Sequence, residues 1–358
     1  MLRSIAMGLA LTIVSGAAGA AGAASATGAT GAADIVDGPR VHWNYSGWGK
    51  PRASSVAYMG LGEYLEKRTG GKFTMQIHWG TLSPPRSVLD GLKLGAFEAG
   101  SYCASYYPAK VPASAGIELP FLPIVSPDQQ AKVADAYAEI DAVQNDFKKW
   151  NAINYHNSIL PPYEVLGKGT PPKSLDDWAG LRIRSPGPSG IALSKLGVTP
   201  TSVPAPDVYT SMDRGLIDAA GFAMYSHLSY RTYELGDWYT FGLKYVNLNC
   251  GLAISIPAYE ALPAQYKQLL EDYKDYGYKK QIEAFDISEN IEGPETFDSA
   301  GLTRITISPE EHDAFAERAG KPVWTEWVQK ITADGYDGQM LLDSILAAAK
   351  TYRDFKFQ

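Results

Sequence analysis

Alternating and helical patterns of apolar residues follow one another in a regular order through the first third of the chain. Alternation of apolar and polar residues predicts strands at 41–49, 72–80 and 101–108. Apolar residues at helical spacing predict helices at 53–71 and 87–100. This β-α-β-α-β order predicts a parallel sheet with helices on both faces, and ligands of such sheets bind beyond the carboxyl ends of the strands.

The same order of elements begins again further along the chain. The patterns predict a second set of strands at 152–158, 181–186, 219–226 and 246–256. They also predict helices at 189–197 and 205–220. From Pro263 onward the chain reads as mostly helical. We therefore expect an α/β fold with two lobes, each a mainly parallel sheet with helices on both faces, and a ligand cleft between the lobes.

The first 33 residues have the pattern of a secretory signal peptide. One arginine at position 3 precedes about a dozen apolar residues, and a long stretch of alanine and glycine follows. The apolar run is shorter than the roughly 20 residues that a membrane-spanning helix needs. We expect residues 1–33 to be a signal peptide cleaved between Ala21 and Ala33, which would place the protein outside the cytoplasm.

Composition narrows the classes of partner. The chain has 358 residues, enough for two domains, and a formal net charge of −7, which argues against a nucleic-acid surface or a polybasic membrane contact. Its two cysteines, Cys103 and Cys250, could form one disulfide or stay two buried thiols, and they are too few for a zinc or iron–sulfur site. The five histidines have no metal-ligand spacing, and no nucleotide or nucleophile-elbow motif occurs. No metal or cofactor is therefore expected.

The stretch GLRIRSPGPSG at 180–190 contains the most informative charged residue. Alternation places Leu181 and Ile183 on one face of a strand and Arg182 and Arg184 on the other. An arginine at the end of a strand covered by helices is either paired structurally or available to an anion. Aromatic residues gather near the predicted strand ends and suggest a cleft with apolar walls: Trp43, Tyr45, Trp48, Trp79, Tyr102, Tyr106, Tyr107, Tyr163, Phe222 and Tyr225.

Residues 171–219, which include this stretch, resemble the solute-binding proteins of TRAP transporters. The segments at 78–100, 117–123 and 252–270 resemble the same family in the same order. The resemblance implies a two-lobed periplasmic protein that closes on an organic acid and delivers it to a pair of membrane permease subunits driven by an ion gradient. It also implies that the protein is not an enzyme.

The resemblance assigns the carboxylate-clamping role to Arg184, whose planar guanidinium suits a carboxylate. Phe222 stands where other members have asparagine or tryptophan, and Gly221 replaces a glutamate that helps to hold a metal ion in one branch. A second arginine of the sialic-acid binders is missing near Tyr163 and Glu164. We therefore expect a monocarboxylate with an apolar or aromatic body and no metal.

The resemblance also assigns the remaining residues of the cleft. The expected ligand contacts besides Arg184 are Ser46, Trp48, Trp79, Ser101, Tyr102, Tyr163, Phe222 and Tyr225. The topology of the family implies that Cys103 and Cys250 lie on neighbouring antiparallel strands and could be bridged. Arg86 is expected to form an ion pair on the lobe surface.

The expected lobes are discontinuous in sequence. Residues 38–161 and 250–289 would form lobe I, and residues 162–249 and 290–358 would form lobe II with the C-terminal helices. Two alternatives stay open: a secreted hydrolase or lyase using a pair such as Ser101 and His156, and a ligand-sensing module of a receptor. The sequence leaves open whether the protein is a monomer or a dimer.

Overall fold

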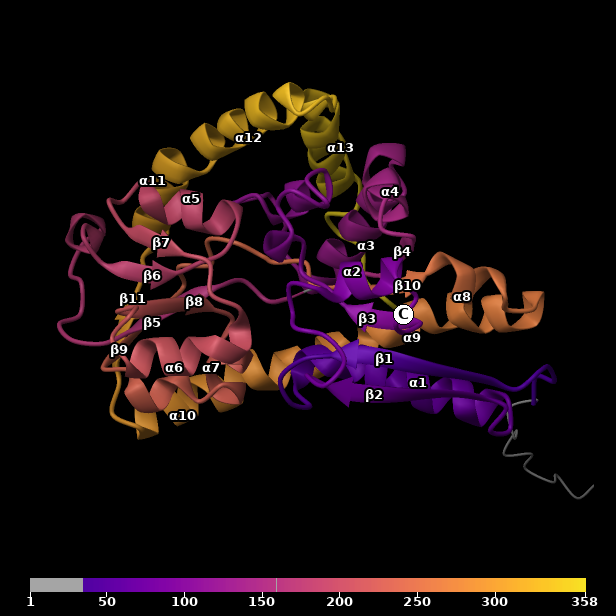
Figure 1. The fold of residues 1–358 in the computed structure, drawn as a ribbon. Coiled ribbons are helices and arrows are strands. Elements are labelled where there is room, and N and C mark those ends of the chain that lie inside the picture. The colour runs from indigo at the N-terminus through magenta and orange to yellow at the C-terminus, as the bar shows by residue number, and fades with distance from the viewer. Residues whose placement is uncertain (1–34, 159) are drawn as a thin grey trace, which may run out of the picture. The chain divides into compact units, whose positions relative to one another are not determined.

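The computed structural model describes residues 35–158 and 160–358 and builds them around two β-sheets (Figure 1). The predicted signal peptide at 1–33 lies outside the described residues. The first sheet has the strand order β2-β1-β3-β10-β4. Its strands are β1 Val41–Gly47, β2 Phe73–Trp79, β3 Ala99–Ser101, β4 Ala152–His156 and β10 Leu252–Ser255. β10 is antiparallel to both of its neighbours, whereas β1 pairs in parallel with β2 and β3.

The second sheet has the strand order β11-β9-β5-β8-β6-β7. Its strands are β5 Glu164–Gly167, β6 Arg182–Arg184, β7 Thr199–Thr201, β8 Ala219–Phe222, β9 Trp238–Phe241 and β11 Thr303–Thr306. β5 is antiparallel to β8 and β9, and the other pairs are parallel. Each sheet is therefore mainly parallel with one antiparallel strand, as the sequence predicted.

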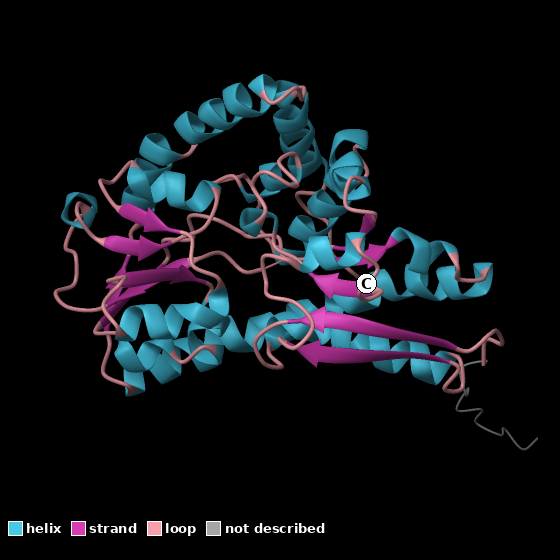
Figure 2. Cartoon of the chain, in the orientation of Figure 1, coloured by secondary structure: helices cyan, strands magenta, loops and turns pink. Residues whose placement is uncertain are grey.

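The two antiparallel strands mark where the chain crosses between the sheets. β5 follows β4 of the first sheet, and β10 follows β9 of the second. At these two crossings the chain enters at the edge where the parallel strands end, so β5 and β10 run against their neighbours. β11, which follows β10 through a long helical segment, pairs in parallel with β9. The arrowheads of the two sheets accordingly point toward one another in Figure 2. The carboxyl ends of the parallel strands, where ligands bind in such sheets, thus face the space between the sheets.

Helices cover both faces of each sheet (Figures 1 and 2). In the first sheet, α1 packs on β2 and on the long helix α9, and α2 packs on β3 and β10. In the second sheet, α5 packs on β7, while α6 and α7 pack on β8. The bounds of these helices are α1 Val56–Arg68, α2 Val88–Lys93, α5 Pro188–Ser194, α6 Val208–Asp213, α7 Met224–Ser229 and α9 Ala264–Ile287.

Two helical segments connect the surroundings of the two sheets. α9 lies against α1 and continues through a π-helical turn, Ser288–Glu292, into α10 Gly293–Ser299, which packs on α7. At the C-terminus, α11 Pro309–Ala319 and α12 Lys321–Ala333 pack on α5, and α13 Gly338–Thr351 packs on α3 Pro127–Ala138. The C-terminal helices therefore contact elements on both sides, and the lobe boundaries given above stay a prediction. The remaining helices are α4 Asp141–Lys148 and α8 Ile256–Glu260.

The predicted strand at 101–108 is wrong over most of its length, and the one predicted at 246–256 is a strand only at Leu252–Ser255. The segment 101–108 was expected to be extended, but β3 ends at Ser101 and residues Ala104–Tyr106 form a 3-10 helix. The backbone nitrogen of Tyr106 donates to the carbonyl of Cys103, which closes this turn. The alternation of apolar and polar residues continues past Ser101, but no neighbouring strand pairs with the chain there. The sequence pattern alone therefore could not locate the end of the strand. The turn carries Tyr106 toward the second sheet.

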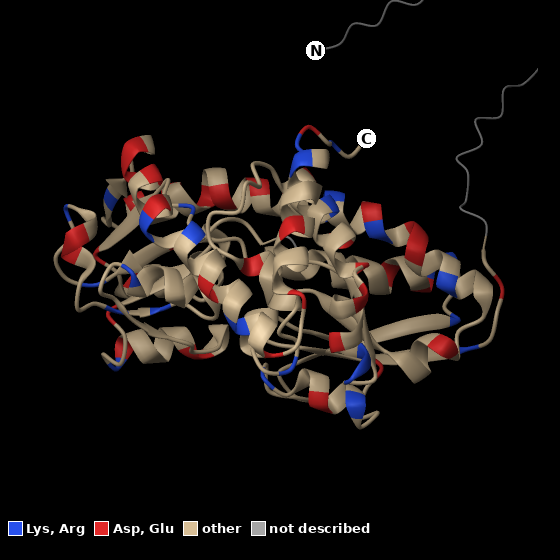
Figure 3. Ribbon diagram, turned by 90° about the horizontal axis from the view of Figure 1, so that it is seen from above, with Lys and Arg blue, Asp and Glu red and all other residues tan. Residues whose placement is uncertain are grey.

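Charged residues of both signs are interspersed over the helices and loops of the ribbon (Figure 3). Their ion pairs are mostly at exposed positions, such as the pair between Arg182 and Asp218. Among the described residues, none of the helices has the length and apolar character that a membrane crossing requires.

Candidate functional site

A narrow cavity lies between the loops that follow the strands of the two sheets. Residues from both sides line it, and none of them is an aspartate, glutamate, histidine or lysine. The lining residues are Trp48, Arg52, Ser54, Tyr58, Ser101, Cys103, Tyr106, Leu160, Tyr163, Ala205, Phe222, Tyr225, Ser226, Tyr230 and Cys250. The cavity is thus walled mainly by aromatic rings and contains one formal charge, that of Arg52.

Arg184 is fully buried behind this cavity. Its Nε donates to the carbonyl of Val203 at 2.9 Å, and its Nη1 donates to the carbonyl of Gly221 at 3.0 Å. The guanidinium carbon lies 4.3 Å from the ring centroid of Phe222, a cation–π contact. Arg184 forms no ion pair within the described part of the chain. Its charge is therefore held by backbone carbonyls and an aromatic face, with no carboxylate to neutralise it.

Tyr106 connects Arg184 to the cavity. Its hydroxyl oxygen accepts from Nη2 of Arg184 at 3.1 Å and from the backbone nitrogen of Ala205 at 2.9 Å. Both donors belong to the second sheet and its loops, whereas Tyr106 follows β3 of the first. Because the oxygen accepts two hydrogen bonds, its own proton is available to an acceptor in the cavity.

The expected surface ion pair of Arg86 is wrong. Its Nη2 donates to the carbonyl and to Oγ of Ser202, which follows β7, and its Nη1 donates to the carbonyl of Tyr106 at 3.1 Å. The guanidinium also lies 5.3 Å from the ring centroid of Tyr106. The loop after β2 places Arg86 against the second sheet, where backbone carbonyls are the acceptors within reach. Arg86 therefore connects the two sides of the cleft.

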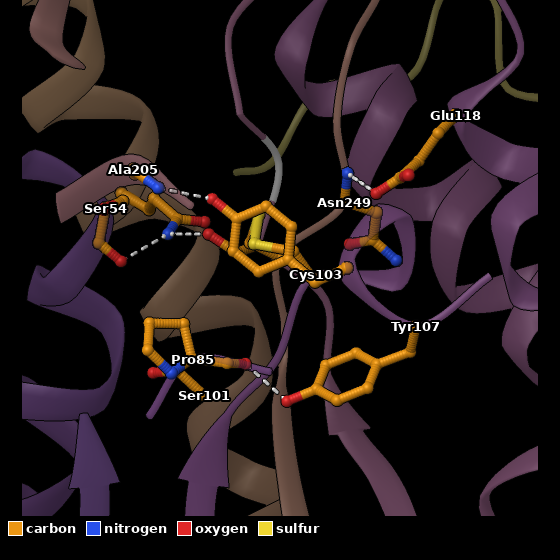
Figure 4. Close-up of a disulfide and its surroundings, with 12 residues drawn as sticks. Ser54, Pro85, Ser101, Cys103, Tyr107, Glu118, Ala205 and Asn249 are labelled. Carbon is orange, nitrogen blue, oxygen red and sulfur yellow. Dashed lines mark hydrogen bonds between the residues drawn. A yellow bond between two sulfur atoms is a disulfide. The ribbon is translucent and has the colours of Figure 1, made fainter. Parts of the chain in front are cut away.

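A disulfide joins Cys103 and Cys250 beside the cavity (Figure 4). Cys103 follows β3 and Cys250 precedes β10, and these strands are antiparallel neighbours. Behind the disulfide, Glu118 is fully buried, and its Oε1 accepts from the backbone nitrogen of Asn249 at 3.0 Å. Burial raises the pKa of Glu118 to about 8, so this carboxyl is neutral below that pH. Figure 4 shows Glu118 and Asn249 facing one another.

Two further carboxyls, one buried (Glu164) and one half-buried (Glu289), support the walls of the cavity without lining it. Burial raises the pKa of Glu164 to about 7, and its oxygens accept from Thr240 Oγ1 and from backbone nitrogens of the turn after β9. Burial likewise raises the pKa of Glu289 to about 7. Glu289 accepts from the backbone nitrogens of Met224 and Tyr225 at 3.1 and 2.7 Å, which fixes the start of α7. Tyr225 is thereby positioned on the cavity wall.

The structure brings five of the nine expected ligand contacts onto the cavity wall: Trp48, Ser101, Tyr163, Phe222 and Tyr225. Arg184 lies behind Phe222, and three others do not line the cavity. The ring of Tyr102 packs on that of Phe147, with centroids 4.8 Å apart. Of the tyrosines after β3, it is Tyr106 that lines the cavity. The ring centroid of Trp79 lies 6.0 Å from that of Tyr58, which itself lines the cavity. Ser46 is fully buried within β1.

The sequence-based reading missed Arg52, Ser54, Tyr58 and Tyr230 altogether and placed Tyr106 only among the general aromatic residues. Arg52 follows β1 in the loop 48–52, so the rule that ligands bind beyond the carboxyl ends of strands could have found it. Tyr230 follows helix α7 and not a strand, so this rule could not have found it. Its position depends on how α7 packs on β8.

The pair proposed for the enzymatic alternative does not form. Ser101 Oγ lies 2.6 Å from the hydroxyl of Tyr45, and His156 Nε2 lies 3.3 Å from the carbonyl of Lys274. Burial lowers the pKa of His156 to about 4, which makes it a poor base near neutral pH. Within residues 35–158 and 160–358, no His, Cys, Asp and Glu side chains gather in a group that could hold a metal ion.

Comparison with known proteins decides the family. The sequence profile of bacterial extracellular solute-binding proteins, family 7, matches residues 57–330. The chain belongs to this family. As a member it is a solute-binding protein and not an enzyme, so the hydrolase or lyase alternative is set aside.

The individual members of the family that resemble this protein share low sequence identity with it. The monocarboxylate 2-oxoacid-binding periplasmic protein of Nostoc sp. is 26% identical over 238 residues, which span 65% of either chain. A TRAP solute-binding protein from a marine metagenome, specific for aromatic acid ligands and crystallised with 3-hydroxybenzoate, superimposes with a TM-score of 0.78. It shares 19% identity, and the match covers 88% of this chain and 99% of that one.

A TRAP solute-binding protein from Rhodoferax ferrireducens, with copurified benzoate, has a TM-score of 0.79 at 20% identity, and the match covers 87% of this chain and 98% of that one. These likenesses establish the two-lobed solute-binding fold.

Proposed function

We propose that the protein is the periplasmic receptor of a TRAP transporter and captures an organic acid in the cleft between the two sheets. The simplest ligand is a monocarboxylate with an aromatic or otherwise apolar body. Its carboxylate is bound at Arg184 and Tyr106, and the loaded protein delivers it to the membrane permease subunits. The alternative of a receptor module would share this site.

The observation that carries the proposal is the uncompensated charge of Arg184. A guanidinium buried without a carboxylate is costly, and a ligand carboxylate would supply the missing charge. Arg184 Nη2 and the backbone nitrogen of Ala205 converge on one oxygen, that of Tyr106. A carboxylate oxygen suits the same pair of donors, and Tyr106 can in turn donate its proton to the ligand.

The walls of the cavity favour an apolar body. Trp48, Tyr163, Phe222 and Tyr225 line it, whereas Leu160 is its one large aliphatic residue. Flat rings on several sides suit a planar or aromatic ligand, which they can contact over both faces. The relatives that bind 2-oxoacids, 3-hydroxybenzoate and benzoate carry ligands of this general kind.

The first experiment measures the thermal unfolding of the purified protein with a panel of acids: benzoate, phenylacetate, 2-oxoacids, C4 diacids and sugar acids. An acid present at 100 times its Kd adds about 2.7 kcal/mol to the free energy of unfolding, which is a clear shift. Benzamide, the neutral analogue of benzoate, should give no shift if the charge is recognised. A shift with the amide equal to that with the acid would contradict a carboxylate clamp.

A matched pair of variants tests the arginine. Arg184→Gln should weaken binding about 100-fold or more, because a ligand carboxylate would be buried without its partner. Arg182→Gln, two residues away on the same strand, should leave Kd within about threefold, because Arg182 is exposed and paired with Asp218. Equal effects of the two variants would refute the assignment. Should Arg184→Gln not fold, the comparison of benzoate with benzamide still tests it.

A further inference from the structure

We propose that Arg52 is a second ligand anchor in the same cleft. The preferred acid then carries, besides the carboxylate at Arg184, a second oxygen-bearing group, either a hydroxyl or a second carboxylate. This inference rests on the proposed function and narrows its ligand class.

Arg52 is the charged residue of the cavity wall. It follows the loop after β1, and its Nη1 donates to the carbonyls of Trp48 and Lys50 at 2.8 and 2.9 Å. These two bonds shape the loop, but they use one nitrogen of the guanidinium. Neither Nε nor Nη2 has a hydrogen-bond acceptor among the described residues, and Arg52 forms no ion pair with them. Arg52 is half-buried at the cavity wall, so both donors are free to bind a ligand oxygen.

Aromatic rings connect Arg52 to Arg184 along one wall. The guanidinium of Arg52 lies 5.7 Å from the ring centroid of Tyr230. The ring of Tyr230 stacks on that of Phe222, with centroids 5.8 Å apart and planes 16° apart. Phe222 in turn contacts the guanidinium of Arg184, whose central carbon lies 4.3 Å from the ring centroid. A ligand that lies along these two rings would meet one guanidinium at each end.

Three hydroxyl groups near Arg52 also lack partners. The side-chain oxygens of Ser54, Tyr58 and Tyr230 are buried, line the cavity, and have no hydrogen-bond partner of acceptable geometry among the described residues. Buried hydroxyls are almost always hydrogen-bonded in folded proteins. Together with Arg52 they form a polar end of an otherwise aromatic cavity, and a ligand oxygen could bind to all of them.

The loop geometry at Gly49 keeps this polar end in place. Gly49 has a φ of +73°, which favours glycine, and a β-carbon there would lie 2.8 Å from the hydroxyl of Tyr230 and 3.0 Å from Nη1 of Arg52. The absence of a side chain therefore allows Tyr230 and Arg52, which come from opposite sides of the cleft, to approach the same point.

The charge balance points the same way. The guanidinium of Arg52 lines the cavity, that of Arg184 lies against Phe222 of the wall, and no lining residue is acidic. A monocarboxylate neutralises one of these charges. A second carboxylate on the ligand would neutralise the guanidinium of Arg52, and a ligand hydroxyl would accept a hydrogen bond from that guanidinium without neutralising it.

The test compares matched ligand pairs by calorimetry. Each dicarboxylate or hydroxy acid is measured against the monocarboxylate with the same carbon skeleton, across several aliphatic lengths and the benzoate series. At least one pair should show about 10- to 100-fold tighter binding of the acid with the second oxygen group, as a charge-assisted hydrogen bond predicts. If every monocarboxylate binds as tightly as its partner, the inference is wrong even though the proposed function stands.

A variant locates the effect. In Arg52→Gln the preference within that pair should fall to about threefold or less, because the acid with the second oxygen group loses more affinity than the monocarboxylate does. Lys50→Gln removes an exposed charge from the same loop and should keep the preference. An equal loss for both acids in Arg52→Gln would assign Arg52 to loop structure alone. If no acid binds the wild-type protein, it is the proposed function that fails. The wild-type comparison decides the inference even if Arg52→Gln does not fold.

Discussion

The hydroxyl oxygen of Tyr106 lies 3.1 Å from Nη2 of Arg184, although 78 positions separate the two residues in the chain. One follows a strand of the first sheet and the other ends a strand of the second. This hydrogen bond therefore spans the cleft and connects the buried arginine with the cavity. Removing this hydrogen bond therefore tests whether contacts across the cleft contribute to ligand binding.

Replacing Tyr106 with phenylalanine should weaken both closure of the cleft and ligand binding. The variant leaves Nη2 of Arg184 and the backbone nitrogen of Ala205 without their acceptor. We expect a loss of about 1–3 kcal/mol in the free energy of unfolding and about tenfold weaker acid binding. Calorimetry and chemical denaturation measure the two effects. Tyr137→Phe is the control, since its hydroxyl donates to the carbonyl of Ala113 away from the cavity and should affect stability alone.

Arg86→Gln should weaken the binding of all acids by a similar factor. Arg86 contacts Ser202 and Tyr106 but does not line the cavity, so it stabilises the arrangement of the two sides without recognising the ligand. We expect Kd to rise about 3- to 10-fold, mainly through faster dissociation, with unchanged discrimination among acids. Stopped-flow kinetics on two different acids gives the dissociation rate of each acid and the ratio of their affinities. A change in the ratio of their affinities would place Arg86 in direct recognition.

The disulfide between Cys103 and Cys250 should contribute strongly to stability because it closes a loop of 147 residues. A thiol assay on the unreduced, denatured protein should detect no free thiol. The double variant Cys103→Ser/Cys250→Ser should lower the free energy of unfolding by about 2–5 kcal/mol. Two thiols in the assay, or an unchanged denaturation midpoint in the double variant, would show that the bridge does not form or does not matter.

Glu118→Gln should become more stabilising, relative to wild type, as the pH rises. The pKa of Glu118 is raised to about 8 by burial, from an ordinary value of 4.5. Between these two pH values the folded wild-type chain holds a proton that the unfolded chain has released. The free energy of unfolding therefore falls with rising pH, and this contribution levels off above about pH 8.

The measurement is urea denaturation of both proteins from pH 4.5 to 8.5. Buried histidines such as His156 titrate alike in both proteins, so the difference between the two curves isolates residue 118. We expect that difference to grow by a few kcal/mol over this range. A constant difference would mean that the carboxyl titrates normally in the folded protein.

Local pattern was sufficient for much of the architecture. Alternation and helical spacing predicted β1, β2, α1 and the mainly parallel sheets, because strand and helix periodicity depend on which residues are buried. The block at 171–219 indicated the family, and the resemblance, not the strand pattern, assigned the clamp to Arg184. The short strands β5, β7, β9 and β11 were not predicted, since three or four residues carry too little pattern.

The sequence by itself determined the fold class and the family, because these follow from periodicity and from a conspicuous motif. The tertiary structure alone decided which residues meet in the cleft. Tyr106 reaches Arg184 because a 3-10 turn ends β3, and Arg52 reaches Tyr230 because Gly49 leaves room for both. Such contacts depend on how two sheets approach one another, and residues far apart in the chain carry no local signal of that approach.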